Sequence, residues 1–80
     1  MHTRELGISR YRKTLLNLHR AQTEFDQLRM AAATLTPGAD VPMERAYRGL
    51  LLLEARVKGM EQALCLSRRQ IAQYRKAAKL

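Results

Sequence analysis

The sequence predicts an all-α protein, an antiparallel two-helix hairpin of coiled-coil type whose second helix is the longer one. Three observations lead to this prediction: a heptad stripe in the second half of the chain, apolar residues at helical spacing in the first half, and a break between them. We expect one domain over residues 1–80, with a helix at about 4–35, a turn at about 36–41 and a helix at about 42–79.

The first predicted helix has apolar residues at helical spacing, and Thr3 or Ser9 can cap its start. The register of this stripe slips between Leu18 and Phe25, so a strict supercoil cannot run through both helices. The stripe consists of Ile8, Tyr11, Leu15, Leu18, Phe25, Leu28, Ala32 and Leu35.

The break contains a turn signal followed by a helix start. Pro37-Gly38 is typical of a turn, and Asp40 precedes Pro42 and Glu44. A capping carboxylate, a proline in the first turn and an acidic side chain near the positive end of the helix dipole all favour a helix start. The short connection predicts that the two helices fold back antiparallel.

The second predicted helix carries the heptad stripe, whose members lie alternately three and four residues apart. Ser67 is the only polar member. This regular spacing predicts one long helix with a continuous apolar seam. The stripe consists of Met43, Ala46, Leu50, Leu53, Val57, Met60, Leu64, Ser67, Ile71, Tyr74 and Ala78.

A second apolar row lies about 130° around the same helix from the heptad stripe. One partner helix cannot cover both rows, so we expect the second row to bind another protein. The alternative is a weakly amphipathic face that only meets solvent. The row consists of Leu52, Ala55, Gly59, Ala63 and Leu66, and Tyr47 and Leu51 extend it.

Positive charge is concentrated in two segments, 1–20 and 62–80, whereas residues 21–61 are nearly balanced. An antiparallel hairpin brings the two basic segments together at its open end, where they would attract nucleic acid, anionic lipid or an acidic protein. We expect this basic end to steer association. Its main residues are Arg10, Arg12, Lys13, Arg68, Arg69, Arg75 and Lys76.

Nucleic-acid binding is the alternative that the charge suggests. However, no helix-turn-helix, zinc-ligand or basic-zipper pattern is present. Tyr11 and Tyr74 lie on the apolar stripes, so we expect them in the core rather than stacked on bases.

The sequence contains no pattern typical of an enzyme, a metal site or a cofactor site. His19 has no second ligand at helical spacing, and His2 lies near the chain start. The single cysteine, Cys65, is expected to be a small, buried or half-buried apolar group in the helix, which fits a reducing cytoplasm. We expect neither a secretory signal nor a membrane span, because no apolar run is long enough.

The layout resembles the small co-chaperones of bacterial type III secretion systems, the YscE/SsaE-like group. The similarity includes the run from Leu50 to Ala55 and the following Glu61, Gln62 and Ala63. The resemblance implies a cytoplasmic helical hairpin without enzymatic activity. Such a protein binds a second chaperone or a needle or translocator subunit, and keeps aggregation-prone helices from assembling early.

We therefore interpret the chain as a non-enzymatic helical-hairpin binding protein, with the second apolar row as its docking surface for a partner helix. Two alternatives stay open. One is a homo-oligomeric basic helical bundle that binds nucleic acid. The other is a coiled-coil stalk component of the export apparatus, although such stalk proteins are normally longer.

Overall fold

The computed structural model describes residues 3–33 and 40–80, with side chains described for 3–31 and 42–80. Within these residues the chain forms three helices and no strand: α1 (Thr3–Ala33), α2 (Asp40–Ala63) and α3 (Arg68–Ala77). The predicted all-helical class is confirmed. The two-helix detail is not, because a third helix is present.

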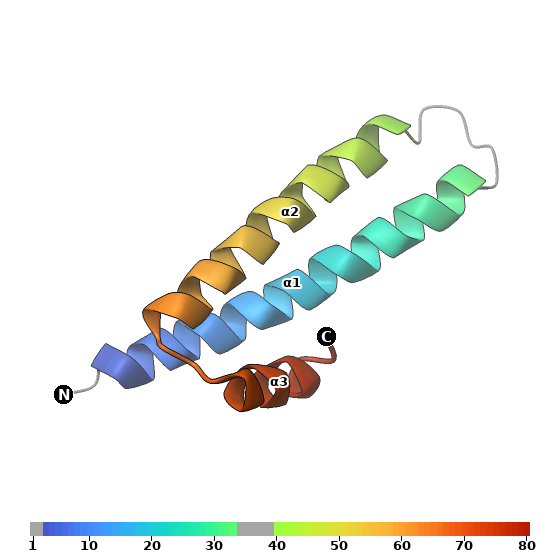
Figure 1. Ribbon diagram of the computed structural model, residues 1–80. Coiled ribbons are helices and arrows are strands. Elements are labelled where there is room, and N and C mark those ends of the chain that lie inside the picture. The colour runs from blue at the N-terminus through green and yellow to red at the C-terminus, as the bar shows by residue number, and fades with distance from the viewer. Residues whose placement is uncertain (1–2, 34–39) are drawn as a thin grey trace.

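Helices α1 and α2 run antiparallel as a long pair, and α3 turns back at their open end to lie against α1 (Figure 1). The molecule is elongated, measuring 52 × 19 × 17 Å. Helix α1 lies within about two residues of the predicted helix at 4–35, and α2 begins at Asp40, two residues before the predicted start at about 42. The predicted turn residues Pro37 and Gly38, the side chain of Asp40 and Leu35 lie outside the described part of the chain.

The heptad stripe faces inward. All of its apolar members are buried or half-buried, whereas Ser67 is exposed. The buried core lies where the three helices meet, and half-buried side chains such as Leu50, Leu53 and Met60 pack against it. The core consists of Tyr11, Leu15 and Leu18 of α1, Val57 of α2 and Ala78 just after α3.

The continuous helix predicted for about 42–79 is wrong, because the chain turns between Ala63 and Arg68. Cys65 has a left-handed backbone conformation with φ of 52°. Its N–H donates to the Gln62 carbonyl at 3.1 Å, and the Leu66 N–H donates to the Glu61 carbonyl at 3.1 Å. These two bonds form a Schellman motif, which satisfies carbonyls at the end of α2.

Helix α3 then begins with a capping box. The Ser67 hydroxyl accepts from the Gln70 N–H at 3.2 Å, and the Gln70 side chain accepts from the Ser67 N–H at 2.9 Å. Ser67, the one polar member of the heptad stripe, is therefore the N-cap of a new helix. The Arg4 side chain also donates to the Leu64 carbonyl at 3.2 Å, near the negative end of the α2 dipole.

The expectation for Cys65 is corrected by this turn. The residue is exposed and lies outside any helix, rather than buried or half-buried within one. The physical reason is the left-handed backbone at this position, which belongs to the turn that ends α2. Left-handed backbone usually favours glycine, so a cysteine at this position gives little warning of a helix end.

Candidate interaction surfaces and the polar clamp

The outer face of α2 carries most of the second apolar row. Leu52 is 73% exposed and Leu51 is 51% exposed, which is high for leucine side chains in a small protein. The small residues of the row, Ala55, Gly59 and Ala63, are also exposed. At 100° per residue they lie on the side of α2 opposite the buried Val57. Neither α1 nor α3 covers this face.

Gly59 lies in open space on this face. A Cβ atom built at this position would meet no atom within 4 Å. A larger side chain therefore fits here without disturbing the contacts between α1 and α2. This geometry makes Gly59 a suitable position for testing the face without unfolding the protein.

Two residues assigned to the row have a different environment from the rest. Leu66 follows the Cys65 turn, is half-buried and packs against the core cluster, so it does not continue the row. Tyr47 is 47% exposed, and its ring packs against Phe25 with 5.6 Å between ring centroids. We define the outer strip as the exposed residues Leu51, Leu52, Ala55, Gly59 and Ala63.

Most residues of the predicted basic end are exposed. They are Arg10, Arg12 and Lys13 on α1 and Arg68, Arg69 and Lys76 on α3. Because α3 folds back against α1 (Figure 1), the helix that carries Arg68, Arg69 and Lys76 lies beside the first helix instead of extending beyond the hairpin. The folded chain thus concentrates positive charge on α1 and α3.

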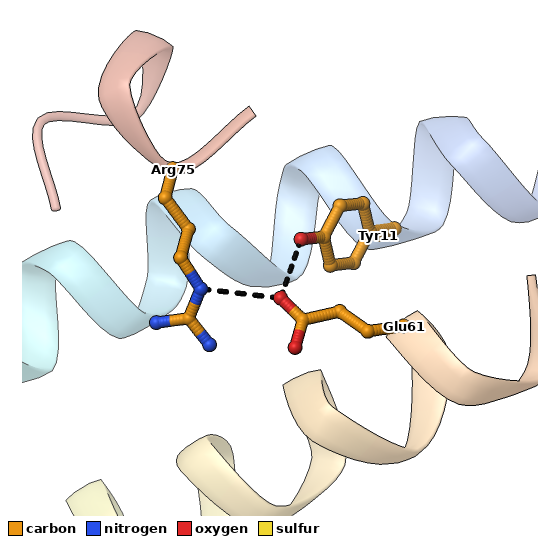
Figure 2. A network of polar contacts seen from close by, with 3 residues as sticks. All are labelled: Tyr11, Glu61 and Arg75. Carbon is orange, nitrogen blue, oxygen red and sulfur yellow. Dashed lines mark hydrogen bonds and ion pairs between the residues drawn. The ribbon is translucent and has the colours of Figure 1, made fainter. Parts of the chain in front are cut away.

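Arg75 differs from the other cations because it belongs to a polar clamp with Tyr11 and Glu61 (Figure 2). The Arg75 Nε donates to Glu61 Oε2 at 3.1 Å, and the Tyr11 hydroxyl donates to the same oxygen at 2.7 Å. The side chains of Arg75 and Glu61 are only 26% and 10% exposed. One carboxylate oxygen therefore ties the three helices together.

The environment of the clamp shifts two pKa values. Burial, followed by the hydrogen bond and negative charge of Glu61, raises the pKa of Tyr11 well above its ordinary value of 10.0. Burial lowers the pKa of Arg75, but the hydrogen bond and charge of Glu61 outweigh that effect and raise it. The clamp therefore favours a neutral phenol and a charged guanidinium, which is the arrangement of a structural ion pair.

Tyr11 and Tyr74 were expected in the core: Tyr11 is fully buried there, whereas Tyr74 is half-buried and packs against it. Their rings form an edge-to-face pair with centroids 5.5 Å apart, which joins α3 to α1. The clamp itself was not predicted from the sequence. The available signal was the position of Glu61, four residues after Val57 and therefore on the inward side of α2.

A shallow groove of about 400 Å³ runs along α1. A small hollow between α1 and α3 adjoins it, since Arg12 and Leu16 line both. Leu16 is 50% exposed. The groove is lined by Glu5, Ile8, Ser9, Arg12, Lys13 and Leu16. The groove therefore has a mixed lining, in which Arg12 and Lys13 of the predicted basic end lie beside the apolar Ile8 and Leu16.

Among the described residues, no group of three or more His, Cys, Asp or Glu side chains could hold a metal ion. In the same part of the chain, no helix combines the length and apolar character needed to cross a bilayer. Comparison with protein-family models, with curated proteins and with solved structures finds no match to this chain.

Proposed function

We propose that the chain is a non-enzymatic binding protein that docks an amphipathic helix of a partner protein on the outer strip of α2. The observation that carries this proposal is the exposure of the strip. The apolar seam of α2 is covered by the protein's own helices, whereas Leu51 and Leu52 on the far side stay in contact with solvent. Covering these leucines with another helix would remove apolar surface from water.

The chemistry around the strip is compatible with an acidic partner helix. Arg45, Arg56 and Lys58 are exposed on the same helix, outside its buried seam. A partner with apolar residues on one stripe and carboxylates beside it would meet both features. The cations would raise the association rate and make it depend on salt, while the leucines would contribute most of the affinity.

The resemblance to the YscE/SsaE-like group turns this binding role into a more specific proposal. In that role the chain is a cytoplasmic co-chaperone of type III secretion, and its partner is a second chaperone or a needle or translocator subunit. The single cysteine suits a reducing compartment. Binding would also stabilise a small protein whose own core is limited.

Site-specific photo-crosslinking in the native host tests the proposal. A photoreactive residue at Leu52 should form an adduct with one helical protein, identified by mass spectrometry as a subunit or chaperone of the export machinery. The matched control is the exposed Gln27 on α1, which lies away from the strip. If Leu52 and Gln27 give the same adducts, or Leu52 gives none, the outer strip is not the binding surface.

A second candidate function, binding of nucleic acid, is supported by the exposed cations of α1 and α3. Filter binding of RNA and DNA at two salt concentrations tests it, because phosphate contacts predict a steep loss of affinity with salt. Reversal of Arg68 and Arg69 to glutamate should then abolish binding. If the same reversal only slows association with a protein partner and weakens its salt dependence, the cations act by steering.

A further inference from the structure

The heptad stripe continues in register across the turn at residues 64–67. Met60 and Leu64 lie before the turn, while Tyr74 and Ala78 lie after it, and all four are buried or half-buried. A single straight helix would place them on one apolar seam. The same sequence therefore suits two conformations, one with α3 folded back and one with α2 and α3 joined.

The turn contains no residue that enforces it. Residues 64–67 are Leu, Cys, Leu and Ser, without glycine or proline. Cys65 has a φ of 52°, a left-handed backbone conformation that residues other than glycine adopt only at an energetic cost. Straightening the segment would relieve that conformation and add helical hydrogen bonds, but it would lose the capping box of Ser67.

In a straight α2–α3 helix, the α3 part could not pack on its own chain. The open end of the hairpin lies close to Leu64, whose carbonyl accepts from Arg4 and whose side chain lies beside Gly7. Residues beyond Leu64 would extend past the start of α1, with Ala78 about 21 Å further on. Tyr74 would lose Tyr11, and Glu61 would lose Arg75.

A second copy of the chain with the same straight α2–α3 helix also lacks these contacts, and it can supply them to the first copy. Its α3 carries the residues that are missing, and its own α1–α2 surface is equally uncovered. Every contact of α3 except those within the turn can therefore form between copies. We propose that α3 exchanges between two copies of the chain, with residues 64–67 straightened and each α3 seated on Tyr11, Leu15 and Glu61 of the other copy.

This exchange goes beyond the partner binding proposed above and uses a different surface. The outer strip of α2 is not part of the exchanged contact, so Leu52→Glu should leave an exchanged dimer unchanged. By contrast, a four-helix bundle formed through the outer strip would dissociate. A dimer of the full chain that is lost on Leu52→Glu would overturn the exchange.

Charge exchange at the clamp provides the sharpest test. Glu61→Arg and Arg75→Glu each place like charges together within one chain. In a mixed exchanged dimer, however, the arginine introduced at position 61 of one copy meets the glutamate introduced at position 75 of the other, and the second site keeps the native pair. Native mass spectrometry and light scattering of the mixture should show a 1:1 heterodimer. Each variant alone should remain monomeric, because its own copies would place like charges together. The double variant, which restores the pair within one chain, serves as the folding control.

The turn at residues 64–67, which acts as the hinge of the exchange, provides an independent test that leaves the clamp intact. Cys65→Gly favours the turned backbone, so it should weaken dimerisation about 100-fold, a factor of about ten for each of two hinges. Ser67→Ala removes the capping side chain and should strengthen dimerisation. Analytical ultracentrifugation over micromolar to millimolar concentrations measures both. If the native chain and Ser67→Ala remain monomeric throughout, the proposal is overturned, whatever the charge-exchange mixture does.

Discussion

Removal of the Arg75 guanidinium tests the clamp directly, because we expect it to lower the free energy of unfolding of this protein. Arg75→Met keeps an apolar stem of similar length but leaves the Glu61 carboxylate with Tyr11 as its only partner in the clamp. That carboxylate is 10% exposed, so water can compensate for the lost donor only in part. The change therefore leaves a largely buried charge without its counter-ion.

The expected cost is about 2 kcal/mol. A hydrogen bond to a charged group contributes about 1.5–3 kcal/mol, and the partial exposure of Arg75 places the loss below the 3–5 kcal/mol typical of a fully buried pair. For a small domain with a urea m-value of about 1 kcal/mol/M, this corresponds to a shift of about 2 M in the unfolding midpoint. Urea titration followed by circular dichroism, at low micromolar protein, measures the shift.

Two controls make the measurement specific to the clamp. Arg68→Met alters an exposed arginine of the same helix and should change stability by less than about 0.5 kcal/mol. In the second, Glu61→Gln is combined with Arg75→Met, and the double variant should be destabilised by less than the sum of the two single changes, because both remove one interaction. If Arg75→Met costs no more than Arg68→Met, the clamp does not hold α3 in place.

Three further predictions concern other parts of the molecule. Because folding raises the pKa of Tyr11, its contribution to stability should be complete below pH 10 and fall as the pH rises further; Tyr11→Phe should flatten that fall, and parallel pH profiles of urea midpoints would contradict this. Cys65→Gly should raise the unfolding free energy by about 1 kcal/mol, whereas Cys65→Val should lower it, as measured by thermal unfolding of the monomer. Gly59→Leu should keep the helical circular dichroism signal and abolish partner capture, and unchanged affinity would exclude the outer strip as the interface.

The sequence was sufficient to predict that the chain is helical and which faces of its helices are buried, but not that the second half forms two helices. The stripe of α1 and the heptad stripe reflect the geometry of a single helix, in which residues three and four apart share a face. For the same reason, the exposed positions of Leu52, Ala55 and Gly59 could be separated from the buried Val57. The partner of that exposed face could not be identified, because the binding chemistry of a partner lies outside the chain.

The turn at Cys65 and the clamp were decided by tertiary structure. Locally, a continuous helix and a Schellman turn followed by a capping box differ by only about 1–2 kcal/mol, so residues 64–67 do not select between them. The contacts that favour the turn come from elsewhere: Tyr11 is fifty positions from Glu61 along the chain, and Arg75 reaches that carboxylate only after α3 folds back. Periodicity therefore determined which side of each helix is apolar. Whether the last helix continues or turns back depends on long-range packing, because only the folded chain brings together the charge and the rings that hold it.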